Sequence, residues 1–312
     1  MDPSGPDIWQ LPASYLPHAA EWPDAERWLP ALPVIAARRA REWGLAADGP
    51  AMHGWTGVVW PVRTREGRRA VMKVSPPVDG TALEITALRA FAADIGETPV
   101  PMIAPLAVDE EDRAILLPRL DSGRSLEDHA DIDEAVTVIA SLLAGIADVP
   151  APTAGLPRLS DELDEIEPQL RPGGEVDPAG ADRARGRLTE LRALAENPAR
   201  QRLLHGDAHF LNVLHTRIDE PAAWVGIDPS PLSGIIEWEP VPLLRNRWAD
   251  ASASGDPDRA LRRRVDQICE ATGGDRALVR ACAQVQAVQA VAGWGLSPAH
   301  MHHPPYAIMS RW

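Results

Sequence analysis

The sequence predicts an α+β protein in two lobes, with a small β-rich N-terminal lobe over residues 1–120 and a mainly helical C-terminal lobe over residues 121–312. A chain of 312 residues is long enough for about two domains with cores of their own. Before residue 120, short apolar stretches alternate with polar residues and are separated by turn signals, which is typical of strands. After Asp121, apolar residues recur mostly at helical spacing.

The N-terminal lobe is expected to begin with an irregular arm over residues 1–33, rich in Pro and Trp, with one short helix. Alternating apolar positions and the glycines between them then predict a small sheet with one amphipathic helix. The expected elements are a helix over 31–43, a strand–turn–strand unit over 52–62, a strand over 69–74, a helix over 82–94, and strands over 103–108 and 114–117.

The C-terminal lobe is expected to contain helices and one small hairpin. The helices are predicted over 133–149, 160–166, 181–197, 259–271 and 275–293, and the hairpin strands over 212–215 and 223–227. Near the C-terminus, His300, His302 and His303 stand beside prolines, and we expect a loosely packed tail there.

Composition excludes several classes of function. The net charge of −14 and the pI of about 5.1 argue against a nucleic-acid partner, because phosphate neutralisation needs a basic face. An acidic chain suits a cationic small molecule instead. Two cysteines make no disulfide framework, there is no 18-residue apolar stretch and the N-terminus lacks a secretory pattern. We therefore expect a cytoplasmic protein with no membrane contact and no evident obligate protein partner.

One residue count carries unusual weight. Lysine and arginine together number 31, and only one of them, Lys73, is a lysine. A lysine is a compact point charge on a flexible stem, whereas arginine is a planar fork. Since this chain uses arginine wherever a general positive charge serves, position 73 is expected to need an ammonium group.

The segment around Asp207 holds the sharpest chemical pattern. Asp207 stands five residues before Asn212, and Asp228 closes the second strand of the predicted hairpin. Phosphoryl transfer needs one carboxylate to accept the proton of the attacking hydroxyl. It also needs an amide and a second carboxylate to hold Mg²⁺ on the phosphates. The spacing therefore favours a kinase with Asp207 as the catalytic base and Asn212 and Asp228 as metal ligands.

The N-terminal lobe supplies the other half of a kinase layout. Lys73 falls on the third predicted strand, and Glu84 lies near the start of the helix that follows. In protein kinases a strand lysine binds the ATP phosphates and pairs with a helix glutamate. We expect that role for Lys73 and Glu84. Gly54 and Gly57 form the turn before the lysine strand, although they do not make a Gly-x-Gly-x-x-Gly pattern.

The His205-Gly-Asp-x-x-x-x-Asn212 segment is similar to that of antibiotic kinases and choline-kinase-like enzymes. With three further stretches it resembles the aminoglycoside/hydroxyurea phosphotransferase family of streptomycin 6-kinase-like enzymes, from about Gly54 to Trp248. Those stretches are Gly226–Gly234, Pro242–Trp248 and the linker-like Ile115–Asp121. The resemblance implies a protein-kinase-like fold that binds ATP and Mg²⁺, with backbone groups near Pro118 and Leu120 contacting the adenine.

Two departures from that family lie on the acceptor side. After the metal aspartate, the family's Gly-Asp-Pro-x-x-Asp stretch is replaced here by Gly234–Glu239, with Glu239 at the second aspartate position. Within the catalytic loop, Phe210 and Leu211 replace the usual Pro-Gly. The base and metal positions are intact, so we expect activity. The identity of the acceptor is what these changes affect.

The acceptor is expected to be a small cationic molecule, best of all an aminoglycoside of the streptomycin type. Most of the negative charge falls in residues 121–312, most densely over Asp161–Glu167, and Glu237 and Trp238 are further candidate contacts. A merely solvated helical face explains Asp161–Glu167 equally well. Two alternatives stay open: a kinase in the same fold for another metabolite or natural-product intermediate, and a non-catalytic nucleotide-binding module.

Overall fold

The computed structural model describes residues 6–77, 80–93, 100–152, 155–217 and 221–312. The chain divides into two compact units. The N-terminal unit comprises Met1–Ala93, Ile103–Asp121 and the short excursion Thr216–Ala222, and the C-terminal unit comprises Asp94–Met102, Ser122–His215 and Ala223–Trp312. The architecture is α+β, as the sequence predicts, and no helix of the described ranges is long and apolar enough to cross a membrane.

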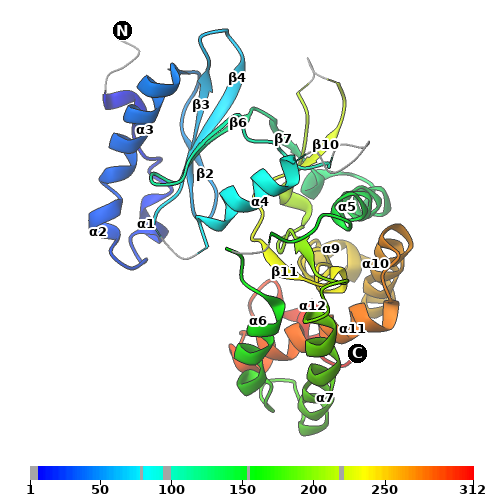
Figure 1. Ribbon diagram of the computed structural model, residues 1–312. Coiled ribbons are helices and arrows are strands. Elements are labelled where there is room, and N and C mark those ends of the chain that lie inside the picture. Colours follow the sequence, from blue (N-terminus) through cyan, green and yellow to red (C-terminus); the bar gives the residue numbers. More distant parts are fainter. Residues whose placement is uncertain (1–5, 78–79, 94–99, 153–154, 218–220) are drawn as a thin grey trace. The chain divides into compact units, whose positions relative to one another are not determined.

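The N-terminal unit is built on an antiparallel sheet in the order β1-β3-β4-β6-β5, with β2 paired to β3 (Figure 1). A 3₁₀ turn and three helices precede the sheet, and one helix follows β4. The bounds are η1 Pro6–Trp9, α1 Leu16–Ala19, α2 Ala25–Trp28, α3 Ala31–Trp43, β1 Ala46–Ala47, β2 Met52–His53, β3 Val58–Arg63, β4 Arg69–Val74, α4 Leu83–Ala92, β5 Ala107–Asp109 and β6 Ala114–Pro118.

The two faces of this sheet have different partners, because side chains alternate along each strand. One face, with Trp60 of β3 and Met72 of β4, packs in a single core with the arm and α3. Trp9 of the arm meets Trp60 edge to face, with ring centroids 6.3 Å apart. The other face carries Lys73, whose cross-strand neighbours are Val59 and Ile115. The arm is thus a structural layer of this unit, with three short helical pieces where one was expected.

The C-terminal unit is mainly helical and carries two small sheets (Figure 1). One sheet has the order β10-β9-β7, and the other pairs β11 with β8. The strands are β7 Asp121–Ser125, β8 Arg202–Leu204, β9 Val213–His215, β10 Trp224–Gly226 and β11 Leu232–Gly234; the helices are α5 Ile132–Ile146, α6 Leu159–Ile166, α7 Pro178–Ala195, α8 Val241–Arg245, α9 Trp248–Ala253, α10 Pro257–Thr272, α11 Arg276–Val288 and α12 His303–Met309.

The longer helices fall where the sequence predicts them, and the expectation of a loose C-terminal tail is wrong. Residues His303–Met309 form α12, in which His303 and Tyr306 are buried. Prolines at the first helical positions lack only N–H groups that have no partner within a helix, so they start α12 rather than prevent it. α12 packs on α8 and α11, and so becomes part of the unit that holds the loop of Asp207 and Asn212.

Candidate active site

The loop after β8 brings the predicted base and one predicted metal ligand together. Asn212 Nδ2 donates to the Asp207 carbonyl at 3.0 Å and to Asp207 Oδ2 at 3.3 Å. These bonds fix the side-chain amide so that its nitrogen faces Asp207. Asn212 is buried, whereas the Asp207 side chain remains 31% exposed and so accessible to an incoming hydroxyl.

Gly206 and His205 give this loop its shape. Gly206 has φ +75°, and a Cβ there would collide with the Ser230 carbonyl, so no other residue fits the position. His205 Nε2 donates to the Ile227 carbonyl at 3.0 Å, and its Nδ1 accepts from the Asp207 N–H at 3.3 Å. Full burial lowers the pKa of His205 to about 4, so the ring is neutral.

Asp228 reaches the same place from the neighbouring hairpin. The Ile227 N–H donates to the Asn212 carbonyl at 2.9 Å, which sets the residue before Asp228 directly against the loop. Asp228 has φ +56°, a left-handed conformation that is costly for a residue with a side chain and that clusters at functional sites. The structure therefore brings together Asp207, Asn212 and the backbone that carries Asp228.

Arg245 is a residue of this site that the motifs do not reveal. It ends α8, and its Nη2 donates to Asp207 Oδ1 at 2.8 Å while its Nη1 contacts Tyr306 of α12 at 3.2 Å. His209 Nε2 lies 3.4 Å from the other carboxylate oxygen, Oδ2. The carboxylate of Asp207 is thus held on both oxygens, which fixes its orientation. The chain of contacts from Asp207 through Arg245 to Tyr306 also links the C-terminal helix to the predicted base.

Glu239 holds the loop from beneath. Its carboxylate accepts the backbone N–H groups of His205 and Gly206, the latter at 3.1 Å, and it is 1% exposed. Burial raises the pKa of Glu239 to about 7, in spite of the two N–H donors, which lower it. The glutamate that replaces an aspartate in the family pattern therefore anchors the two residues before Asp207, and its side chain is not available to an acceptor.

Glu239→Gln is expected to change how stability depends on pH. A carboxyl with a pKa near 7 when folded and about 4.5 when unfolded stabilises the fold fully below pH 4.5, and this contribution is lost as pH rises through 7. In the variant this contribution is absent. The amide also cannot accept from both N–H groups, which costs about 1–3 kcal/mol. Urea unfolding of both proteins at pH 5 and pH 8 measures the difference.

Comparing the wild type with the variant separates the pH dependence that Glu239 contributes from the pH dependence that His205 contributes. His205, with its lowered pKa, gives the opposite slope, since its stabilising contribution grows between about pH 4 and pH 6.5. That slope is common to both proteins and cancels in their difference. A loss of stability equal at pH 5 and pH 8 would show that Glu239 does not titrate in this range.

In the N-terminal unit, Lys73 and Glu84 meet as expected. Lys73 Nζ lies 2.7 Å from Glu84 Oε2, and the two side chains are only 9% and 7% exposed. Removing one member of a buried ion pair leaves an uncompensated charge and typically costs about 3–5 kcal/mol. The pair thus fixes the ammonium of the only lysine, on the sheet face opposite the arm.

The turn between β2 and β3 lies directly against this lysine. The Gly54 N–H closes the turn on the Gly57 carbonyl at 3.0 Å. A Cβ on Gly57 would lie 2.9 Å from Lys73 Cε and 3.0 Å from Ser75 Oγ, so any larger residue there would have to displace the lysine side chain. The hydroxyl of Ser75 is buried and has no hydrogen-bond partner among the described residues. An ammonium, a glycine turn and an unpartnered hydroxyl fit a phosphate group.

The remaining nucleotide-binding candidates lie at the end of the same sheet. Pro118 is the last residue of β6 and pairs with Ala70 of β4. Leu120 follows, just before β7, and both residues are half-buried. Within the described ranges, no three His, Cys, Asp or Glu side chains gather as a metal site. The carboxylate and amide oxygens of Asp228 and Asn212 are donors that suit Mg²⁺ when phosphate oxygens complete its shell.

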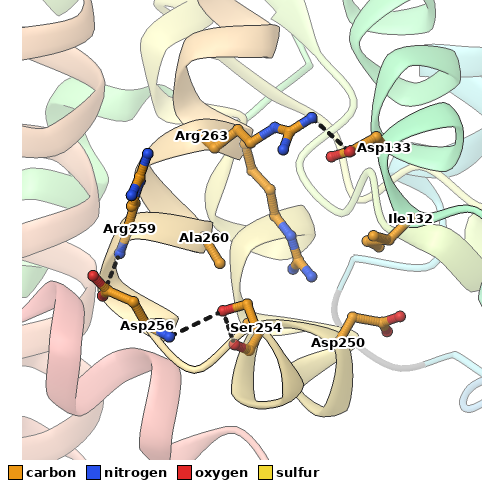
Figure 2. Close-up of a pocket in the computed structure, with 10 residues that line it drawn as sticks. Ile132, Asp133, Asp250, Ser254, Asp256, Arg259, Ala260 and Arg263 are labelled. Atoms are coloured by element: carbon orange, nitrogen blue, oxygen red, sulfur yellow. Dashed lines mark hydrogen bonds and ion pairs between the residues drawn. The ribbon is translucent and has the colours of Figure 1, made fainter.

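The C-terminal unit has a cavity of about 380 Å³ between α5, α9 and α10, shown in Figure 2. Its acidic lining residues are engaged by arginines or by backbone N–H groups, and Asp250 pairs with Arg247 outside the lining. Arg263 pairs with Asp133 at 2.6 Å, and Asp256 accepts the Arg259 N–H at 3.1 Å. Because these acids are already engaged, the cavity shows no preference for a cation or an anion.

A second cavity in this unit, of about 360 Å³, has a different character. Three carboxylates of α6 line it, from Asp161, Glu162 and Glu165, against one cation, Arg158. Burial, and then the nearby Glu165, raises the pKa of Glu162, because both disfavour its charged form.

The acidic stretch Asp161–Glu167 thus splits into two faces. Asp164 and Glu167, on the other face of the helix, pair with Arg192 at 2.8 and 2.6 Å. The cavity-facing half of the stretch is therefore the one that is left to attract a cation.

Other acceptor-side expectations do not hold. Glu237 is 3% exposed and pairs with Arg200 at 2.6 Å, and Trp238 is also buried. Neither side chain can contact an acceptor in this conformation. Phe210 is buried beneath Arg247, whose guanidinium lies 5.4 Å from the ring centroid, while Leu211 is exposed. Of the two catalytic-loop replacements, only Leu211 presents its side chain outward.

Comparison with known proteins identifies the family of this chain. The family model for aminoglycoside/hydroxyurea antibiotic resistance kinases matches residues 42–296. The streptomycin 6-kinase of Streptomyces griseus is 34% identical over 255 residues, covering 81% of this chain and 80% of that protein. The hydroxyurea phosphotransferase of Kitasatospora aureofaciens is 36% identical over 263 residues, covering 83% and 72%.

The fold is shared more widely. A choline/ethanolamine kinase family protein of Mesorhizobium loti superposes with a TM-score of 0.58 and 14% sequence identity. The match covers 89% of this chain and 94% of that one. Such a likeness shows the protein-kinase-like fold alone. The family match, by contrast, spans both the Lys73–Glu84 pair and the Asp207 loop, so the chain is a small-molecule kinase that belongs to the aminoglycoside/hydroxyurea antibiotic resistance kinase family.

Proposed function

We propose that this kinase transfers the γ-phosphoryl group of Mg-ATP to a hydroxyl of a cationic aminoglycoside, with streptomycin as the best candidate. The observation that carries the proposal is the Asp207 carboxylate. It is partly exposed, oriented on both oxygens, and accepts a hydrogen bond from Asn212, which also donates to the Asp207 backbone carbonyl. A group so placed can accept the proton of an attacking hydroxyl.

The chain's own residues have separable roles in this proposal. Lys73, oriented by Glu84, binds phosphate oxygens beside the Gly54–Gly57 turn. Asn212 and Asp228 hold the metal, and Pro118 and Leu120 offer backbone groups to the adenine. Mg-ATP, when bound, supplies the phosphoryl group and the cation that offsets its charge. Asp207 orients the acceptor hydroxyl and takes its proton.

The carboxylate-lined cavity beside α6 supports a cationic acceptor. The α6 helix begins where the Ser233 N–H of β11 donates to the Pro157 carbonyl at 2.9 Å, and β11 pairs with β8, the strand that leads into the catalytic loop. The helix that carries the cavity carboxylates Asp161, Glu162 and Glu165 is therefore connected, through β11 and β8, to the loop that carries Asp207. A molecule with several ammonium or guanidinium groups would gain most from these carboxylates.

An ADP-release assay with Mg-ATP and a panel of aminoglycosides led by streptomycin, with hydroxyurea included, tests the proposal. We expect turnover with streptomycin. In the double variant Asp161→Asn/Glu165→Gln the KM for streptomycin should rise about tenfold with an unchanged KM for ATP, since two partly exposed charge contacts are lost. Asp164→Asn is the matched control, because it removes one carboxylate of the same helix that faces Arg192.

The panel also decides between acceptors. Turnover with hydroxyurea and none with any aminoglycoside would replace the proposed substrate with a neutral one. The acceptor would then be the one named for the hydroxyurea phosphotransferase of Kitasatospora aureofaciens. Binding of Mg-ATP without turnover on any acceptor would favour the non-catalytic module.

A further inference from the structure

We propose that the N-terminal arm is the positioning element of the Gly54–Gly57 turn, and that Tyr15 and His18 thereby set the affinity of the kinase for its nucleotide. The proposal rests on the nucleotide-binding role proposed above for this turn. The arm residues concerned precede residue 42, where the family match begins.

The carbonyls of four consecutive turn residues are all occupied. Tyr15 Oη donates to the Thr56 carbonyl at 2.7 Å, and His18 Nε2 lies 2.7 Å from the Trp55 carbonyl. His53 Nδ1 lies 2.9 Å from the Gly54 carbonyl. The fourth carbonyl, of Gly57, accepts from the turn's own Gly54 N–H. Two of the four contacts come directly from the arm.

A third contact depends on the arm indirectly. A carbonyl can only accept, so His53 carries a proton on Nδ1, which donates to the Gly54 carbonyl. Ser14 Oγ of the arm lies 3.0 Å from Nε2 of the same ring. The arm therefore also contacts the side chain that holds the Gly54 carbonyl. By the same reasoning His18 is protonated on Nε2.

Ring packing reinforces these hydrogen bonds. The His18 ring stacks on Trp55 with centroids 5.0 Å apart and planes inclined by 25°. Tyr15 is fully buried, 5.3 Å from the His18 ring and 5.4 Å from the His53 ring. Burial raises the pKa of Tyr15 to about 12, so its hydroxyl remains a donor at any physiological pH.

The arrangement suits a phosphate-binding turn for two reasons. A turn with two glycines loses much conformational entropy when a ligand orders it, and external contacts that order it beforehand reduce that loss. Moreover, the hydrogen bonds that the described arm residues make to the turn backbone go to carbonyls, so they consume none of the backbone N–H groups that phosphate oxygens would need. The opposite side of the turn, at Gly57, lies against Lys73 and Ser75.

The test compares Tyr15→Phe and Tyr15→Phe/His18→Phe, which keep the rings and remove one or both direct hydrogen bonds. A hydrogen bond worth about 1 kcal/mol corresponds to about fivefold in affinity, so we expect the Kd for Mg-ATP to rise about fivefold and then further in the double variant. The KM for the acceptor should stay unchanged. Amide hydrogen exchange at residues 54–57 should become faster in the variants even without nucleotide.

Trp28→Phe is the matched control. Its Nε1 donates to the Pro23 carbonyl at 2.9 Å, a hydrogen bond of the same kind within the arm that does not touch the turn. We expect it to lower the melting temperature without changing the Kd for Mg-ATP. An unchanged Kd and unchanged turn exchange in the double Tyr15/His18 variant would overturn the inference alone. Absence of Mg-ATP binding in the wild type would overturn it together with the proposed function.

Discussion

Asp207→Asn is expected to lower kcat by roughly 10²- to 10⁴-fold while the Kd for Mg-ATP stays within about twofold of the wild-type value. The amide of asparagine keeps the size and one acceptor oxygen of aspartate, so contacts with Arg245 and Asn212 can persist in part. It cannot take up a proton, so the acceptor hydroxyl loses its base. Steady-state kinetics and calorimetric titration with Mg-ATP measure the two quantities.

Asp266→Asn serves as the control for that variant. Asp266 lies on the exposed side of α10 and pairs with Arg276 at 2.8 Å, so its replacement removes an aspartate–arginine pair of the same unit. It should leave kcat unchanged, as exposed pairs contribute about 1 kcal/mol or less to stability. A kcat for Asp207→Asn within threefold of the wild type would reject Asp207 as the base.

The orientation of Asp207 by Arg245 has a further consequence. A guanidinium that donates to a carboxylate oxygen makes a charge-assisted hydrogen bond, which is stronger than a neutral one. Arg245 therefore holds the Asp207 carboxylate in a fixed orientation. Since Tyr306 contacts Arg245, helix α12 contributes to the position of the Asp207 carboxylate.

Whether an interaction could be predicted from the sequence depends on how far apart its two partners lie along the chain. Asp207 and Asn212 lie in one loop, and the Lys73 strand directly precedes the Glu84 helix, so spacing alone brings each pair together. Glu239 contacts a backbone N–H 34 residues before it. Nothing local in the sequence distinguishes a buried glutamate that holds a loop from one that faces an acceptor.

The arm shows the same limit more strongly. Tyr15 and His18 reach turn carbonyls 41 and 37 residues away. Every residue has a backbone carbonyl, so the residue types of the turn do not reveal such contacts. The Pro- and Trp-rich composition indicated irregular structure correctly, but it did not indicate that this structure packs on the sheet as one core. For α12 a local signal did exist, since adjacent prolines are favourable at a helix start.

The use of a single lysine leads to the second prediction. Lys73→Arg keeps a positive charge, which this chain elsewhere always carries on arginine, yet we expect at least about tenfold loss in kcat/KM for ATP. The planar fork is longer and bulkier than an ammonium. At position 73 the guanidinium must fit between Glu84 and the backbone of Gly57. The space there is narrow, because a Cβ built on Gly57 would lie only 2.9 Å from Lys73 Cε. Steady-state kinetics at varied ATP concentration measure the loss.

A second variant separates binding of phosphate from stability of the fold. Lys73→Met leaves the buried Glu84 without its ammonium and should cost about 3–5 kcal/mol, whereas Lys73→Met/Glu84→Gln removes both charges and should recover most of that stability. Neither should recover turnover, because no ammonium remains to bind phosphate. If the double variant turned over like the wild type, Lys73 would serve the fold alone, and full activity in Lys73→Arg would show that any cation suffices at this position.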